Sequence, residues 1–105
     1  MARFDVYRHP DAELRKFTPY LLDVQNDHIH SVDTRVVLPL RAARLSGPPM
    51  RDLNPIFEVD GTSVVLDTPA LAAFPAAELR QPVLSLKPQS ADLIIGALDT
   101  LFGSY

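Results

Sequence analysis

Ten prolines interrupt the 105 residues of this chain, about twice their usual share. Proline has no amide hydrogen to donate and its ring clashes with the preceding helical turn, so it ends or kinks a helix. Until Pro88 the prolines follow one another at intervals that leave little room for a long helix. This spacing favours a small β architecture with one helix at the C-terminal end.

The most strand-like stretch runs from Tyr20 to Leu40. Two β-rich runs, residues 20–25 and 35–40, are joined by nine residues in which Asn, Asp, His and Ser dominate, a composition typical of turns. We therefore predict a broad antiparallel hairpin.

The two runs of this hairpin differ in their expected burial. Residues 36–38 are consecutive apolar residues, as in a strand covered on both faces, whereas polar and apolar residues alternate over residues 22–25. We expect the second run to be central in the sheet and the first to be half-exposed. Pro39 cannot donate to a ladder, which places it at a strand end or a bulge.

Four further runs have the pattern of strands. Residues 2–7 alternate in polarity, as in a strand with one solvated face. Residues 56–59 and 63–66 flank Asp60-Gly61-Thr62, and Asp-Gly between β-rich runs is a strong hairpin signal. Residues 82–86 form the last predicted strand.

Three remaining segments are predicted mainly as connections. Residues 9–19 read as a solvated loop with room for a single helical turn. Residues 41–50 read as a connecting loop in which a helical turn could start but Gly and Pro stop it. Residues 68–71 fit either a first helical turn, with Pro69 at a favoured position, or a short strand, which we favour.

The C-terminal segment is predicted to be one helix that Ser90 caps and Gly103 ends, with Asp92 in the first turn. Gly96 costs about 1 kcal/mol relative to Ala inside a helix, which indicates either close approach of another backbone, such as a second subunit, or an unoptimised position. The apolar positions follow the three-and-four spacing of one buried stripe, made of Ala91, Ile94, Ile95, Leu98, Leu101 and Phe102.

Length and composition describe a single domain spanning residues 1–105. The size suffices for one modest core, and a hydrophobic content of 47% with 22% charged residues excludes disorder. The chain has no cysteine, no signal-like apolar stretch at its start and no apolar run of about 18 residues. We expect a soluble cytoplasmic protein that does not contact a membrane. The net charge of −3 argues against direct nucleic-acid binding, so a protein is the expected partner.

No catalytic or metal-binding constellation is evident. His28 and His30, with Asp27 or Asp33, fall short of a zinc site, and no cysteine is available to complete one. The cluster of Asp23, Asp27 and Asp33 is interpreted as turn chemistry. No serine lies in a G-x-S-x-G turn and no phosphate-binding loop is present, so we expect neither an enzyme nor a cofactor.

The order of short motifs resembles the CcdB family of plasmid and chromosomal toxins. DVQ at residues 23–25 and RVVLPL at residues 35–40 carry the resemblance, and DLNP at 52–55, the short hairpin and LFG at 101–103 extend it. The resemblance implies a mainly β fold, an SH3-like antiparallel barrel or sheet with a small additional hairpin and one C-terminal α-helix. It also implies a two-fold homodimer with these helices near the axis.

The same resemblance implies a function in plasmid maintenance. CcdB-like toxins bind the DNA gyrase A subunit and trap the cleaved gyrase–DNA complex without catalysis, and a CcdA-like antitoxin displaces them.

The gyrase contact in the family comes from the end of the terminal helix and the loop after DVQ. Ile29 and Phe102 match family residues, whereas His28 and Asp99 replace an aliphatic residue and an amide. The best-known members end in Phe-Trp-Gly-Ile, but this chain continues from Phe102 with Gly103, Ser104 and Tyr105, so that Tyr105 is the aromatic candidate for a cation.

Two alternatives remain open at this point. MazF-type endoribonucleases share the barrel, and Thr34 and Arg35 are the residues that offer an RNase chemistry. The second alternative is a non-toxic homologue that acts only as an interaction module.

Overall fold

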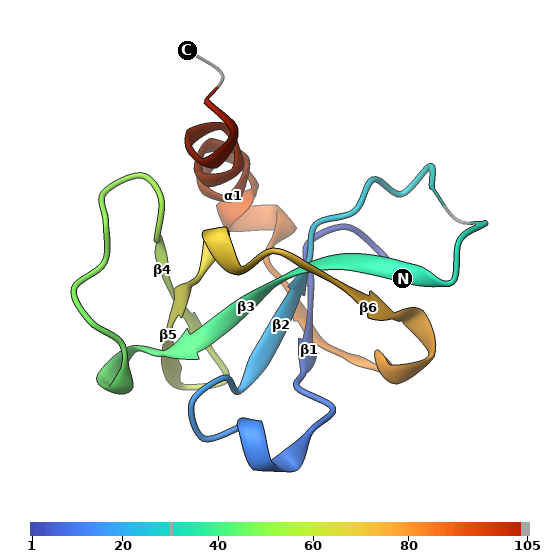
Figure 1. Ribbon diagram of the computed structural model, residues 1–105, viewed down its shortest axis with the longest axis horizontal. Coiled ribbons are helices and arrows are strands. Elements are labelled where there is room, and N and C mark those ends of the chain that lie inside the picture. The colour runs from blue at the N-terminus through green and yellow to red at the C-terminus, as the bar shows by residue number, and fades with distance from the viewer. Residues whose placement is uncertain (30, 104–105) are drawn as a thin grey trace.

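The computed structural model describes residues 1–29 and 31–103. Over these residues the chain forms seven antiparallel strands, four 3-10 turns and one α-helix (Figure 1). The elements follow the order β1 (Asp5–Arg8), η1 (Ala12–Leu14), β2 (Tyr20–Asp23), β3 (Thr34–Ala42), η2 (Ala43–Leu45), β4 (Ile56–Val59), β5 (Thr62–Leu66), η3 (Thr68–Ala70), β6 (Ala72–Pro75), η4 (Ala76–Glu78), β7 (Pro82–Ser85) and α1 (Lys87–Phe102).

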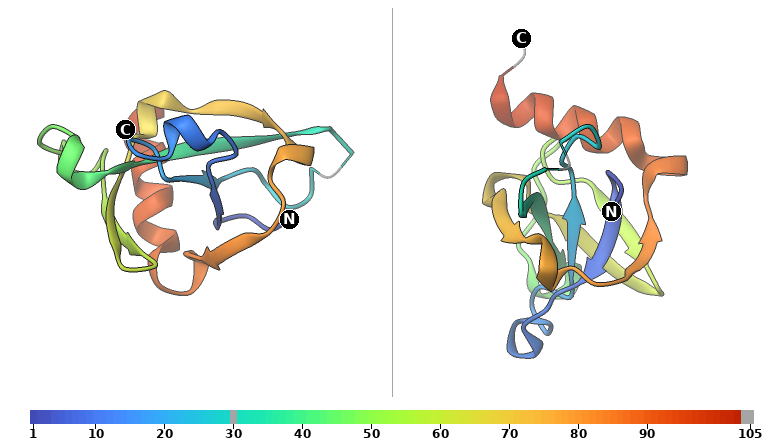
Figure 2. Two further views of the ribbon diagram at one scale, coloured as in Figure 1. Left: turned by 90° about the horizontal axis from the view of Figure 1, so that it is seen from below. Right: turned by 90° about the vertical axis from the view of Figure 1, so that its right-hand side faces the viewer.

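The strands form one curled sheet in the order β4-β5-β3-β2-β1-β7, with β6 as an additional partner of β3. β3 is the longest strand. It pairs with β2 along one side and with β6 and then β5 along the other. The sheet therefore closes into a half-barrel, and α1 packs on one of its faces (Figure 2). This architecture confirms the predicted mainly β fold with one C-terminal helix.

The β4–β5 hairpin forms as predicted. Val59 pairs with Thr62, and the two residues between them both have positive φ, +51° at Asp60 and +80° at Gly61. Paired positive φ angles match the right-handed twist of hairpin strands, and glycine adopts them without steric cost.

Two apolar clusters lie on opposite faces of the sheet. The larger one joins strand residues such as Leu22, Leu38 and Leu66 to Ile94 and Ala97 of α1. The smaller cluster lies on the other face and consists of Tyr7, Leu21, Val37 and Leu79, with Phe74 against it.

The expectation that the first run of the hairpin is half-exposed was wrong. β2 lies between β1 and β3 and is buried on both faces, with Leu21, Leu22 and Asp23 all nearly inaccessible. The polar residues of this run, Asp23 and Gln25, are buried because their side chains form hydrogen bonds with groups of β3. A polar residue at an alternate position can be either hydrogen-bonded inside the fold or exposed to solvent, and the sequence pattern looks the same in both cases.

Several element boundaries differ from the sequence prediction; β2 is shorter than the predicted run and β3 is longer, extending from Thr34 to Ala42. The first strand begins at Asp5, because Phe4 has a φ of +75° and breaks the extended conformation. Residues 68–70 form the helical turn that we had ranked second, and the strand follows at β6. Within the predicted loop 9–19, η1 forms with Asp11 as its cap.

The helix also begins earlier than predicted. α1 starts at Lys87, and its N-cap residue is Leu86 rather than Ser90. The Ser85 hydroxyl accepts a hydrogen bond from the Lys87 amide, at 3.1 Å, and Pro88 lies in the first turn, where its missing amide hydrogen costs nothing. Gly103 ends the helix as predicted. Among the described residues, no helix combines the length and hydrophobicity of a membrane-spanning segment.

Candidate functional site

The end of α1 presents an exposed aromatic side chain. Phe102 is 70% exposed in the last helical turn. Gly103 adopts the left-handed conformation, φ +69°, and its amide donates to the carbonyl of Asp99 at 2.9 Å. This bond closes the helix directly after Phe102. The structure thus brings together three predicted site residues: Asp99, Phe102 and Gly103. Ser104 and Tyr105 lie outside the described residues.

Phe102 is one of several apolar side chains that α1 exposes. The predicted stripe is buried only at Ile94 and partly at Ala91, Leu98 and Leu101, while Ala97 completes the buried face. Leu93 is 57% exposed and Ile95 is 38% exposed. Among residues 1–29 and 31–103, nothing outside the helix's own neighbouring backbone lies within 4 Å of a Cβ built on Gly96. α1 is therefore apolar on more than the face that its own sheet covers.

A groove of about 480 Å³ runs beside this exposed face. It lies between α1 and the segment that precedes β4, and Asp52, Leu93 and Gly96 are among its lining residues. Asp92 and Asp99 from the helix add two carboxylates to that of Asp52. The groove next to the helix end is therefore both acidic and partly apolar.

The second predicted part of the site is the turn after β2. The His28 amide donates to the side-chain oxygen of Asn26 at 2.9 Å, and the Ile29 amide donates to its carbonyl at 3.0 Å. Ile29 is 48% exposed and His28 is exposed. The turn presents both side chains to solvent, but it stands apart from the end of α1 within one chain (Figure 1).

A buried ion pair holds the base of this turn. The Arg35 Nε donates to Asp23 Oδ2 at 2.7 Å and its Nη2 donates to Asp23 Oδ1 at 2.9 Å. The two side chains are 6% and 0% exposed. Burial raises the pKa of Asp23, and the hydrogen bonds from Arg35 and the Gln25 amide oppose this shift by favouring the carboxylate.

Sequence reasoning treated Asp23 as part of a turn and missed this pair. The turn chemistry is present, since the Gln25 amide donates to Asp23 Oδ1 at 3.0 Å, but the dominant partner is Arg35. The sequence did contain a signal for this pair, because Asp23 and Arg35 lie in the two runs of the predicted hairpin that face each other.

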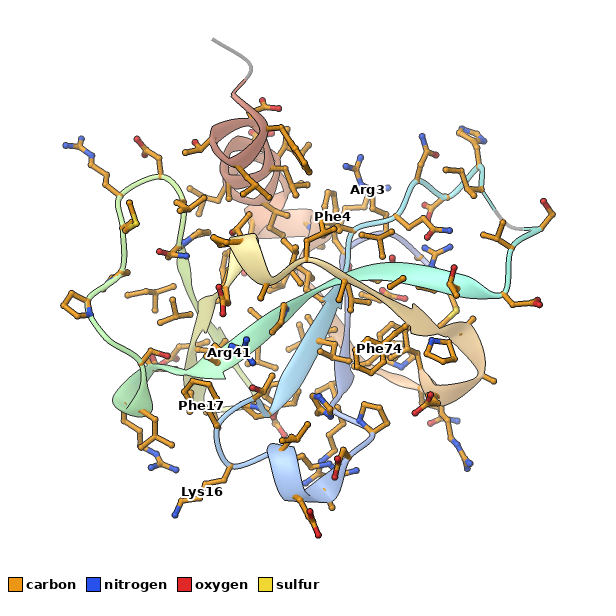
Figure 3. All side chains as sticks on the ribbon, in the orientation of Figure 1. Arg3, Phe4, Lys16, Phe17, Arg41 and Phe74 are labelled. Atoms are coloured by element: carbon orange, nitrogen blue, oxygen red, sulfur yellow. The ribbon has the colours of Figure 1, made fainter. Side chains whose placement is uncertain are left out.

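Gln25 and Asp27 extend the network into the turn. The Gln25 side chain donates to the carbonyl of Ile29 at 3.1 Å and accepts from the amide of Val36 at 3.0 Å. Asp27 accepts from the amide of Arg3 at 2.6 Å, and Arg3 lies with its guanidinium carbon 4.8 Å from the ring centre of Phe4 (Figure 3). The N-terminal segment and β3 thus hold the turn from two sides.

The histidines and carboxylates that the sequence offered as metal ligands form no metal site among the described residues. Within residues 1–29 and 31–103, no three His, Asp or Glu side chains are placed to hold a metal ion, and His30 lies outside that part. His9 is buried, its Nδ1 accepts from the Asp11 amide at 3.0 Å, and burial lowers its pKa.

One family model, described as CcdB protein, matches residues 3–103 of the 105. It covers the β2 and β3 strands, the turn between them and α1 up to Gly103. A search among curated proteins gives no match.

Proposed function

This chain belongs to the CcdB family, and on that premise we propose that it is the toxin of a type II toxin–antitoxin module that binds the DNA gyrase A subunit. In this proposal the toxin holds the cleaved gyrase–DNA complex more tightly than the resealed one. A ligand with such differential affinity shifts the population toward the cleaved state without making or breaking a bond.

The observation that carries the proposal is the exposed Phe102 on the closed end of α1. Burying one such side chain in a partner contributes about 1.5–3 kcal/mol. The adjoining carboxylates of Asp52, Asp92 and Asp99 suit a partner surface with a cationic side chain, because a charge-assisted hydrogen bond is stronger than a neutral one. An apolar tip beside an acidic groove suits a partner surface that offers an apolar contact and a cationic side chain.

We further propose that the active species is a homodimer. The exposed apolar residues Leu93 and Ile95 and the open face at Gly96 support an association through α1. A two-fold dimer repeats each site element, so the turn at Ile29 and the tip at Phe102 need not be neighbours within one chain. A CcdA-like antitoxin is the expected neutralising partner.

Catalysis is not part of the proposal. The RNase alternative depends on Arg35 as the group that stabilises phosphoryl charge, and Arg35 is 5% exposed, with two of its three guanidinium nitrogens, Nε and Nη2, bonded to Asp23. A guanidinium engaged in this way is not available to a phosphate in solvent. This geometry favours the binding function over the endoribonuclease.

The test is a gyrase cleavage assay with purified protein. We expect the wild type to increase linearised plasmid in the presence of a bacterial gyrase and ATP, and Phe102→Ala to reduce this effect at least 10-fold, since about 1.4 kcal/mol of binding corresponds to a factor of ten. Phe17→Ala is the matched control, because Phe17 is an exposed aromatic residue, 45% accessible, on η1's connection to β2.

Cleavage that Phe102→Ala leaves unchanged would refute the role of the tip. If the wild type neither inhibits gyrase nor arrests growth when expressed in a sensitive host, the non-toxic alternative holds. Degradation of a long RNA by the pure protein would favour the RNase instead.

A further inference from the structure

The first residues of the chain form a strained tight turn, residues 2–5, which we call the N-terminal turn. The Asp5 amide donates to the Ala2 carbonyl at 3.1 Å, and Phe4, the third residue, has a φ of +75°. A positive φ at the third residue but not at the second, Arg3, is that of a type II turn, in which glycine is usual at the third position. A side chain makes this conformation unfavourable, and it persists only where surrounding contacts fix it.

Contacts on two sides fix Phe4. Its amide donates to the carbonyl of Asp23, the last residue of β2, at 2.6 Å. Its carbonyl accepts from the amide of Leu86, the N-cap residue of α1, at 2.9 Å. Phe4 is 4% exposed and belongs to the larger core cluster. The N-terminal turn therefore joins the end of β2 to the start of α1.

Asp27 connects the N-terminal turn to the turn after β2. Its Oδ1 accepts from the Arg3 amide at 2.6 Å, and the Nη2 of Arg35 lies 3.9 Å from the same oxygen. The Arg3 Nε donates to the carbonyl of Val24 at 3.0 Å, so Arg3 holds the segment after β2 at two points (Figure 3). The Asp27 side chain is 50% exposed, so burial in the core does not account for its contacts.

We propose that Asp27 is a positioning residue: its carboxylate, bonded to the Arg3 amide, sets how the turn after β2 presents His28 and Ile29 to a partner. This inference rests on the proposed gyrase contact of that turn. It assigns Asp27 a role that acts through its neighbours and requires no contact between Asp27 and gyrase.

The bonds of the turn divide into two kinds. The bonds from the His28 and Ile29 amides to Asn26 are local, so they fix the shape of the turn. The bonds of Asp27 to the N-terminal turn and of Gln25 to β3 fix where the turn stands on the sheet. A segment already held in its binding conformation loses less conformational entropy on association, so the loss of such a bond weakens binding without removing a contact to the partner.

The first test compares two substitutions of Asp27 in the gyrase cleavage assay. Asparagine keeps an oxygen that accepts from the Arg3 amide, whereas alanine has none. We expect Asp27→Ala to raise the protein concentration for half-maximal cleavage about 10-fold, the lower range for a hydrogen bond to a charged group, and Asp27→Asn to raise it about 3-fold or less. Asp33→Ala is the matched control, because Asp33 is an exposed carboxylate in the same connection and bonds to Ala76 through its backbone carbonyl, which alanine keeps.

The second test measures the position of the turn without gyrase. The Ile29 amide bonds to the Asn26 carbonyl at 3.0 Å, so its hydrogen exchange in an NMR experiment reports opening of the turn. We expect Asp27→Ala to accelerate this exchange about 10-fold and Asp27→Asn to leave it close to that of the wild type. Circular dichroism should show the same fold for each variant, because the side chain is half-exposed.

Arg3→Pro removes the same bond from the donor side. Proline is favoured at the second position of a type II turn, so this variant keeps the N-terminal turn and loses only the amide hydrogen and the side chain. Arg3→Ala is its control, because it removes the side chain and keeps the amide. We expect Arg3→Pro to weaken cleavage as Asp27→Ala does, and the double variant to be no weaker than either single one, since both remove one interaction.

Three results overturn the inference. Asp27→Asn as weak as Asp27→Ala would mean that the charge acts directly, and Asp33→Ala as weak as Asp27→Ala would mean that any carboxylate of the connection suffices. Unchanged exchange of the Ile29 amide in Asp27→Ala would mean that Asp27 does not hold the turn. A wild type without effect on gyrase would instead refute the proposed function, and the exchange measurement would still decide whether Asp27 positions the turn.

Discussion

Replacing Asp23 by asparagine should destabilise this protein more than any other single charge removal that we consider. The substitution keeps the size of the side chain and removes the charge that Arg35 faces inside the fold, where the two side chains are 0% and 6% exposed. Removing one partner of a buried pair costs about 3–5 kcal/mol, because the other charge stays buried without compensation. A domain of this size has a total stability of only about 5–15 kcal/mol.

The measurement is urea unfolding followed by circular dichroism, since the chain has no tryptophan. We expect Asp23→Asn to lower the free energy of unfolding by at least about 3 kcal/mol, or the melting temperature by more than about 12 °C. Asp67→Asn is the matched control. Asp67 forms the analogous pair with Arg41 at 2.9 Å but is 34% exposed, so its loss should cost at most about 1 kcal/mol.

A second comparison separates the lost charge from the lost packing. Replacing both partners, Asp23→Leu with Arg35→Met, removes the uncompensated charge and should recover most of the stability. Equal effects of Asp23→Asn and Asp67→Asn would refute the reasoning, because burial would then make no difference to the cost.

Three further predictions concern single residues. Gly61→Ala should lower the free energy of unfolding by about 1 kcal/mol or more in a denaturant titration, because φ is +80° there, and Gly47→Ala should not, since its φ is not positive; equal effects would contradict this. Gly96→Ala should stabilise the chain by up to about 1 kcal/mol if the face stays open, and Gly96→Leu should raise the dimer dissociation constant in light scattering if α1 forms the interface; a monomer at micromolar concentration would defeat the dimer. The depressed pKa of His9 means that its neutral form stabilises the fold above pH 6.5 and that this contribution is lost as pH falls through the lower folded value; an NMR titration midpoint above 6.5 would contradict the sign.

The parts of the fold that sequence predicts well are those that local chemistry determines. Asp60-Gly61 specifies its hairpin because few residues adopt two successive positive φ angles. Gly103 specifies the helix end because its left-handed φ of +69° is one that glycine adopts without steric cost. Ser90 failed as a cap because Leu86 and Pro88 start the helix earlier, and sequence alone does not rank competing starts.

The candidate site was predicted less completely because its support is tertiary. His28 and Ile29 lie in an exposed turn and Phe102 lies at an exposed helix end, but their role in binding stays a prediction. The pair of Asp23 and Arg35 needs two strands in one register to become visible. Arg8, Arg15 and Arg80 line one hollow although they lie far apart in the chain, so no local sequence pattern predicts that they come together.

Pro39 lies inside β3, paired with Leu21 in an unbroken register, so the prediction of a strand end or a bulge was wrong there. Its carbonyl accepts from the Asp67 amide at 2.9 Å, and the nitrogen of a strand residue points to the same neighbour as its carbonyl, so the Pro39 nitrogen faces the junction where β6 gives way to β5. Pro39 is buried, so any other residue would turn an amide hydrogen toward this junction that would need an acceptor there. Proline has no amide hydrogen, so at the place where β3 changes partner from β6 to β5 this residue leaves no donor unpaired.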